Sequence, residues 1–242
     1  MKLVLDIGNT QIKLGIFEHL KLIHTECFQH NDNQNINLNY IKKFKPTVSI
    51  ISSVVPNLTD KYVKNIYNIF GLDSLIVNNE NCQIDLKVPE PNTVGADRIC
   101  NVVATIKIYN KPAIVIDFGT ATTYDVINKN GQFIGGIIAP GIKTSSQYLI
   151  EKAALLNYVD FEFPKKVIGK NTEDNIKSGI MFGAIDQIEG MITRINNETK
   201  QNNNIILTGG FSKLISPKIS LEHTCDIDLT LKGMILIHES NN

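Results

Sequence analysis

Two short segments of the sequence place a carboxylate, a glycine and hydroxyl side chains directly after an apolar strand. The first, LVLDIGNTQIK, runs from Leu3 to Lys13, and the second, AIVIDFGTATTYD, runs from Ala113 to Asp125. An ionised carboxylate at the end of a buried strand costs free energy unless a cation or hydrogen-bond donors compensate for it. Glycine lets the backbone approach a ligand closely, and hydroxyls and backbone N–H groups donate to phosphate oxygens. Each segment therefore suits a turn that holds a phosphate chain and its metal.

The first turn offers specific groups for this chemistry. Asp6 fits a ligand of Mg²⁺, because Mg²⁺ on a phosphate chain takes one or two carboxylates and keeps several waters. Gly8, Asn9 and Thr10 would supply backbone and side-chain donors, and Lys13 would neutralise a phosphate. The alternative is a hairpin with a solvated tip, and one short motif does not separate the two. The second Asp-x-Gly turn makes a pair of phosphate-binding turns the favoured interpretation.

Two further glycine segments are weaker signals. TGG at 208–210 follows a predicted strand and would let adenine or ribose lie against the backbone, although strand-to-helix connections often carry glycines for packing alone. GKNT at 169–172 is not a Walker A loop. That motif needs a glycine at the position of Pro164, and its last glycine is followed by Lys-Ser or Lys-Thr, where this chain has Lys-Asn-Thr. From the residues alone, Thr172 fits the N-cap of the following helix slightly better than a ligand contact.

The segment GADR at 95–98 opens a predicted helix, so Asp97 and Arg98 lie in a first turn near the positive end of the helix dipole. One interpretation is a carboxylate that stabilises the helix beside a surface cation. In a phosphotransferase, Asp97 would instead accept the proton of an attacking hydroxyl, and Arg98 would bind an anionic substrate. Phosphoryl transfer depends mainly on positioning and charge stabilisation, so one base, one cationic residue that binds the substrate and one Mg²⁺ suffice. The residues alone leave both interpretations open.

The composition fits a globular protein with a small-molecule partner. Hydrophobic residues make up 43% of the 242 residues, and 24 Lys plus Arg balance 24 Asp plus Glu. The chain therefore has no excess of positive charge of the kind that binds nucleic acid or an anionic membrane. The four cysteines form no CxxC pair. No apolar run is long enough to span a bilayer, and Asp6 interrupts the apolar region that a signal peptide would need. We therefore expect a cytoplasmic protein with reduced thiols and with no nucleic-acid or membrane partner.

Apolar periodicity predicts the elements that must position these groups. Strands are predicted at 3–5, 12–17, 48–51, 75–77, 133–138 and 205–207, with a strand pair in 113–127. Helices are predicted at 58–70, from Gly95 onward, at 144–156 and at 173–194. The order of strand, Asp, Gly turn and second strand occurs once in each half of the chain, which favours two similar half-molecules over coincidence.

The order of the motifs resembles that of the type III pantothenate kinases. DIGNTQIK, GADR, DFGTATTYD, GGIIAPGI, GKNTEDNIKSG, LTGG and the LTLKGMILI tail follow the family's order and spacing from Leu3 to about Ile237. The resemblance implies an α/β, actin-like (ribonuclease H-like) fold of two similar lobes, 1–112 and 113–242, with an ATP cleft between them. It also implies ATP-dependent phosphorylation of pantothenate, the first step of coenzyme A biosynthesis, by a homodimer whose substrate pocket lies at the subunit interface.

The resemblance further implies roles for individual residues. Asp97 would be the catalytic proton acceptor, Asp117 would bind a monovalent cation, K⁺ or NH₄⁺, and Asp6 would hold Mg²⁺ with ATP. Thr172 would contact the substrate, which overturns the preference for a purely capping role. The implied ATP-binding residues are Asp6, Ile7, Gly8, Asn9, Thr10, Gln11, Ile12, Lys13 and Thr120, and the implied substrate-binding residues are Gly95, Ala96, Asp97, Arg98 and Thr172.

The chain departs from the family's pattern at one position. Many members carry a tyrosine seven residues before the GxDR motif, where this chain has Val88, so the packing around pantothenate is expected to differ. Two alternatives to a pantothenate kinase are another actin-superfamily enzyme, such as a sugar kinase or a polyphosphatase, and a non-catalytic regulatory protein. The presence of Asp6, Asp97 and Asp117 together argues against the regulatory protein, because a binding module needs no base beside an ATP site.

Overall fold

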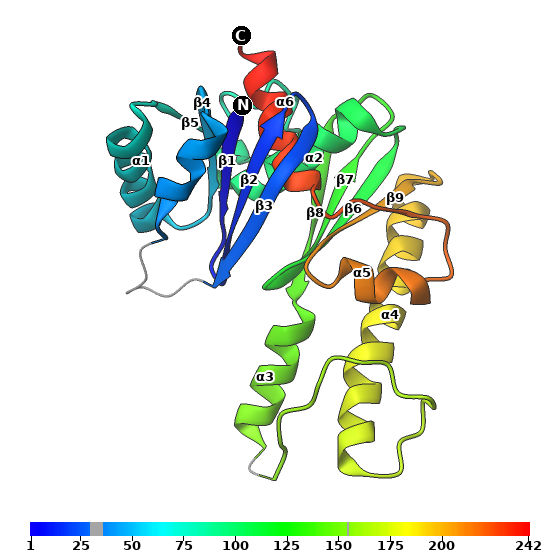
Figure 1. Cartoon of the computed structure of the whole chain (residues 1–242). Coiled ribbons are helices and arrows are strands. Elements are labelled where there is room, and N and C mark those ends of the chain that lie inside the picture. The colour runs from blue at the N-terminus through cyan, green and yellow to red at the C-terminus, as the bar shows by residue number, and fades with distance from the viewer. Residues whose placement is uncertain (30–35, 154) are drawn as a thin grey trace. The chain divides into compact units, whose positions relative to one another are not determined.

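The computed structural model describes residues 1–29, 36–153 and 155–242, and it contains two five-stranded sheets (Figure 1). By its internal contacts the chain divides into two compact units. The first unit comprises residues 1–110, 131–134 and 228–242, and the second comprises residues 111–130 and 135–227. Each unit is built around one of the two sheets.

The first sheet has the order β3-β2-β1-β4-β5. Its strands are β1 (Lys2–Ile7), β2 (Gln11–Glu18), β3 (Lys21–Gln29), β4 (Val48–Ser53) and β5 (Ser74–Ile76). β1 pairs antiparallel with β2 and parallel with β4, and β4 pairs parallel with β5. Because β1 and β4 run in the same direction, their carboxyl ends meet at one edge of the sheet, where Asp6 and Ser52 stand opposite each other.

The second sheet repeats this topology. Its strands are β6 (Ala113–Phe118), β7 (Ala121–Ile127), β8 (Phe133–Pro140), β9 (Asn204–Gly209) and β10 (Thr224–Cys225), in the order β10-β9-β6-β7-β8. β6 pairs antiparallel with β7 and parallel with β9, as β1 does with β2 and β4. The predicted likeness of the two halves is therefore confirmed in the sheet topology, and Asp6 and Asp117 hold equivalent positions.

Helices cover both faces of the first sheet, and the alternation of side chains along each strand decides which residue meets which helix. Leu3, Leu5 and Ile7 pack in one buried cluster with residues of α1 (Pro56–Phe70) and of the short 3₁₀ helix η1 (Leu38–Phe44). Val4 packs in a separate cluster with residues of α2 (Ala96–Ile108) and α6 (Leu229–Ser240). Asp6 shares its strand face with Val4, so it lies on the side of the sheet that α2 and α6 cover.

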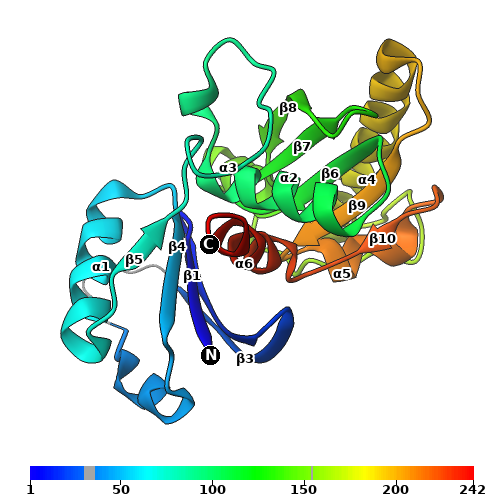
Figure 2. The same cartoon turned by 90° about the horizontal axis from the view of Figure 1, so that it is seen from above.

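The helices α2 and α6 lie side by side (Figure 2) and approach closely at Gly233. A Cβ atom at Gly233 would lie only 2.0 Å from the carbonyl oxygen of Cys100. The buried Asn101 of α2 accepts a hydrogen bond from the Thr230 hydroxyl of α6 at 2.8 Å. This packing explains why residues 228–242 group with the first unit. The contiguous lobes at 1–112 and 113–242 stay a prediction about the two halves of the repeat.

In the second unit, one long helix supports the sheet. α4 (Thr172–Thr199) runs beside β9 (Figure 1), and its buried isoleucines pack against Ile114, Ile116 and Leu207. α3 (Ile142–Lys152), α5 (Ser212–Ile215) and η3 (Ser216–Lys218) complete this unit, and η2 (Pro91–Thr93) precedes α2 in the first. The helix predicted at 144–156 starts earlier, after Gly141 at its N-cap, and ends earlier, at Lys152, while the Thr144 hydroxyl in its first turn donates to the Thr120 carbonyl.

Candidate active site

The turn between β1 and β2 is tight and presents polar groups. The Gly8 N–H donates to the Gln11 carbonyl at 2.9 Å, which closes the turn around Asn9 and Thr10. Asn9 is exposed at the tip, whereas the side chains of Ile7 and Ile12 are buried in the apolar core. Of the predicted ATP-binding segment, the two isoleucines can therefore offer a ligand only their backbone groups.

Asp6 lies in a row of three polar residues on neighbouring strands. It pairs in register with Lys13 of β2 on one side and with Ser52 of β4 on the other. The fully buried Ser52 donates a hydrogen bond from its hydroxyl to Asp6 Oδ1 at 2.9 Å, and Lys13 Nζ donates to Asp228 Oδ1 at 2.9 Å. The sequence placed Ser52 at a strand end but predicted no role for it, and it gave no signal for Asp228.

Asp97 lies in the first turn of α2, where its Oδ1 accepts a hydrogen bond from the backbone N–H of Arg98 at 2.8 Å. Burial raises the pKa of Asp97 above its usual value, and the hydrogen bond and the positive charge of Arg98 oppose this effect. A Cβ atom at Gly95 would lie 2.6 Å from Asp97 Oδ1. Gly95 therefore leaves the space in which the carboxylate sits.

Cys100 connects Asp97 with the row of polar residues on the sheet. Its thiol is fully buried, and burial together with the charges of Asp6 and Asp97 raises its pKa, while a hydrogen bond with Ser52 opposes the shift. The Cys100 thiol therefore lies beside Ser52 and within electrostatic range of the Asp6 and Asp97 carboxylates. The end of β1 and the start of α2, distant in sequence, lie on the same side of the first sheet.

Arg98 stacks on an aromatic ring that the sequence did not single out. Its guanidinium carbon lies 5.6 Å from the ring centroid of Phe133, a distance typical of a cation–π contact. Phe133 is itself held by backbone hydrogen bonds, from its N–H to the Asp85 carbonyl at 3.0 Å and from the Lys87 N–H to its carbonyl at 2.8 Å. The segment that precedes Val88 thus helps to orient Arg98.

The second Asp-x-Gly turn, in the second unit, resembles the first. The Gly119 N–H donates to the Ala121 carbonyl at 3.0 Å, two residues on, whereas the Gly8 N–H reaches the residue three positions on, so the second turn is one residue shorter. Thr120 is exposed, and its carbonyl accepts bonds from the Gly141 N–H at 3.1 Å and the Thr144 hydroxyl at 2.6 Å. A Cβ atom at Gly141 would lie 2.5 Å from the carbonyl oxygens of this turn. The glycine of the GGIIAPGI motif therefore fixes the position of Thr120.

Comparison with known proteins decides the family. The sequence model described as type III pantothenate kinase matches residues 2–194. The chain belongs to the type III pantothenate kinase family. A type III pantothenate kinase from Sulfurihydrogenibium sp. (strain YO3AOP1) is 39% identical over 254 residues, which cover 98% of this chain and 99% of the relative.

Solved structures confirm the α/β, actin-like fold of two similar lobes. A protein from Campylobacter jejuni assigned to the Baf family of transcriptional activators superposes with a TM-score of 0.62 at 21% identity, over 99% of this chain and 98% of that one. The activator of 2-hydroxyisocaproyl-CoA dehydratase from Clostridium difficile, solved with bound ADPNP, gives 0.57 at 12% identity over 99% and 96%. At these identities the likeness shows the fold alone.

For a type III pantothenate kinase, the position of Thr172 is informative. Thr172 is the first residue of α4 and is exposed, but the N-cap is Asn171, whose side-chain oxygen accepts a bond from the Asp174 N–H at 2.8 Å. The capping role considered for Thr172 was therefore wrong. An exposed hydroxyl at the start of this helix stays a predicted substrate contact.

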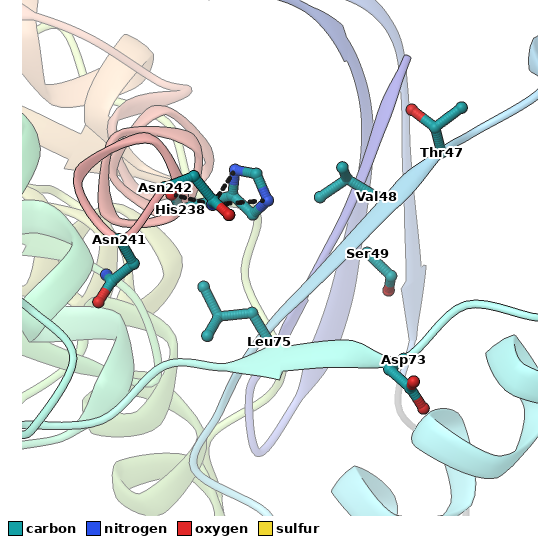
Figure 3. A pocket seen from close by; sticks show the side chains of 8 residues that line it. All are labelled: Thr47, Val48, Ser49, Asp73, Leu75, His238, Asn241 and Asn242. Atoms are coloured by element: carbon teal, nitrogen blue, oxygen red, sulfur yellow. Dashed lines mark hydrogen bonds between the residues drawn. The ribbon is translucent and has the colours of Figure 1, made fainter.

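The described part of this kinase contains no preformed cluster of metal-binding side chains, and its described pocket lies away from the predicted site residues. No group of three or more His, Cys, Asp or Glu residues in 1–29, 36–153 or 155–242 is placed to hold a metal ion. A pocket of about 280 Å³ in the first unit (Figure 3) has His238, Asn241 and Asp73 in its wall, and none of the predicted site residues lines it.

Proposed function

We propose that this member of the type III pantothenate kinase family transfers the γ-phosphoryl group of ATP to the primary hydroxyl of pantothenate. The product is 4'-phosphopantothenate, and the reaction is the first step of coenzyme A biosynthesis. The family assignment over residues 2–194 carries the proposal. The partly buried carboxylate of Asp97 supports it, because Asp97 and Asp6 both raise the pKa of the Cys100 thiol, which puts a base in the neighbourhood of a predicted phosphate-binding turn.

In this proposal Asp97 accepts the proton of the attacking hydroxyl. Its hydrogen bond from the Arg98 N–H fixes the carboxylate in the first turn of α2. Arg98 binds the carboxylate of pantothenate, and its stacking on Phe133 holds the guanidinium in place. A substrate carboxylate held by one residue and a hydroxyl held by its neighbour would orient pantothenate for in-line attack.

We further propose that the β1–β2 turn and Thr120 bind ATP, and that Gly95 and Thr172 contact pantothenate. Asp6 would hold Mg²⁺, which neutralises charge on the phosphate chain when it is bound, and Lys13 would approach the phosphates from the neighbouring strand. Asp117 would bind K⁺ or NH₄⁺. Because ATP and pantothenate are metabolites of the cytoplasm, we propose that location. Among the described residues, no helix is long and apolar enough to cross a membrane.

A homodimer is also proposed, and exposed apolar side chains of the second unit support it. These side chains gather near α3 and in the segment before α4: Ile138, Tyr148, Leu149, Leu155, Tyr158, Val167 and Ile168. Exposed apolar side chains in such number are typical of an interface between proteins when they adjoin one another. We expect sedimentation equilibrium to give twice the 27.0 kDa mass of the chain, and a monomer at micromolar concentration would contradict the dimer.

The product of the reaction tests the proposed function directly. The full chain is incubated with ATP, Mg²⁺, K⁺ and pantothenate, and the phosphorus NMR spectrum is recorded. We expect a new phosphomonoester resonance and a mass increase of pantothenate by one phosphoryl group. Formation of inorganic phosphate with unchanged pantothenate would overturn the proposal.

The raised pKa of Asp97 predicts the acid limb of the pH profile. A general base must be ionised, so kcat/KM for pantothenate falls as the pH drops through the pKa of this carboxyl. Because burial moves that pKa above the usual 3.8, the fall begins at a higher pH than for an exposed aspartate. The profile is measured from pH 4 to 8 with ADP release as the readout. An acid limb that persists unchanged in the residual activity of Asp97→Asn would assign the titration to another group.

A further inference from the structure

Asp117 lies in a row of three polar residues, as Asp6 does in the first sheet. It pairs in register with Thr123 of β7 and with Thr208 of β9. Directly paired residues on neighbouring strands project their side chains to the same face of the sheet. Two hydroxyl groups therefore flank the Asp117 carboxylate, one on each side.

Both flanking hydroxyls are buried and lack a hydrogen-bond partner among the described residues. Thr208 is only 1% exposed, and neither its Oγ1 atom nor that of Thr123 makes a hydrogen bond. Buried polar groups are nearly always satisfied, so an unsatisfied pair calls for a water or an ion that completes it. Gly209 follows Thr208 at a φ of 86°, and a Cβ atom there would lie 2.3 Å from Asp117 Oδ1. The glycine thus allows β9 to approach this carboxylate closely.

The equivalent row of the first sheet has different chemistry. There Ser52 takes the place of Thr208 and donates a hydrogen bond to the carboxylate of Asp6 at 2.9 Å. Lys13 takes the place of Thr123 and brings an ammonium group to the row. With the same strand pairing, the second row has hydroxyl oxygens at both flanking positions. Neither oxygen accepts a hydrogen bond from a described residue.

We propose that Thr123 and Thr208 bind, through their hydroxyl oxygens, the monovalent cation assigned to Asp117. A carboxylate and two hydroxyls are oxygen ligands of the kind that hard cations prefer. The bound cation would satisfy two buried oxygens that the protein leaves unsatisfied. The inference deepens the proposed function, because it adds two residues to the cation site of the proposed kinase.

Thermal unfolding of the full chain measures K⁺ binding at this site independently of catalysis. KCl is titrated against choline chloride at constant ionic strength, with ADP and Mg²⁺ present, and the midpoint of the K⁺-dependent rise in Tm is recorded. Thr123→Val and Thr208→Val remove one hydroxyl each and keep the shape of the side chain. Thr122→Val is the matched control, because Thr122 is the neighbouring residue on β7 and pairs with Phe118 on the opposite face of the sheet.

We expect each of the first two variants to raise the K⁺ midpoint at least about tenfold, and Thr122→Val to leave it unchanged. Thr208→Ser, which keeps the oxygen, should retain K⁺ binding, and Thr208→Ala, which also removes the oxygen, replaces the valine variant if that variant does not fold. Wild-type midpoints in Thr123→Val and Thr208→Val, or a wild-type Tm that does not respond to K⁺, would overturn the inference. Neither result would affect the proposed function, which depends on formation of phosphopantothenate.

Discussion

Asp97→Asn is expected to lower pantothenate-dependent turnover by about 10²–10⁴-fold, the usual contribution of a general base. Asparagine has nearly the same shape as aspartate and can still accept the hydrogen bond from the Arg98 N–H, which in the native chain is 2.8 Å long. The start of α2 should therefore keep its structure while the proton acceptor is lost. Steady-state ADP release gives the rate, and nucleotide titration gives the affinity for ATP, which we expect to change little.

The matched control for this variant is Asp60→Asn. Asp60 is an exposed residue of α1 and lies outside every predicted contact, so its replacement removes one negative charge without touching the site. We expect turnover close to that of the native chain. If Asp97→Asn turned over pantothenate as fast as Asp60→Asn does, Asp97 would not be the base.

Gly233→Ala is expected to destabilise the protein by about 3 kcal/mol or more, at the upper end of the range for overpacking a core. The added methyl group would lie 2.0 Å from the carbonyl oxygen of Cys100, and backbone atoms cannot rotate away as a flexible side chain can. α6 would have to move away from α2, which would weaken the buried bond between Thr230 and Asn101. Equilibrium unfolding in urea measures the loss. Because α2 also carries Asp97, we expect turnover to fall with stability.

A second glycine serves as the control. Gly179 lies in α4, and a Cβ atom there would meet nothing within 4 Å. In a helix interior, alanine is favoured over glycine by about 0.8–1.0 kcal/mol, so Gly179→Ala should stabilise the protein slightly. Equal effects of the two substitutions on the unfolding free energy would contradict the close approach of α2 and α6.

The parts of the site that the sequence predicted are those with a local signal. The two Asp-x-Gly turns and the GADR helix start combine a strand or helix pattern with a specific turn residue, and both features act within about ten residues. The likeness of the halves was visible for the same reason, because Asp6 and Asp117 each follow an apolar strand and precede a glycine. The structure places these residues in equivalent rows of two sheets with one topology.

The parts that escaped prediction depend on contacts distant in sequence. Ser52 hydrogen-bonds to Asp6 because β4 pairs with β1, and Phe133 contacts Arg98 because a short segment returns beside Leu86. Neither pairing has a signature in the residues concerned. β3 was missed although it alternates in burial, since its hydrophobic residues are interrupted by His24 and Glu26. The segment of α6 was recognised only as the C-terminal part of the family's motif order, and no helix was predicted there, because its apolar residues are not confined to one face.

The measurement that tests the central claim most directly is ADP release by the purified chain with Mg²⁺ and K⁺, in the presence and absence of pantothenate. N-acetylmannosamine, tested at the same ATP concentration, distinguishes a sugar kinase, and release of inorganic phosphate from polyphosphate distinguishes a polyphosphatase. We predict ADP release that depends on pantothenate and that neither of the other compounds elicits. ADP release that does not respond to pantothenate, or that responds better to the sugar, would contradict the assignment.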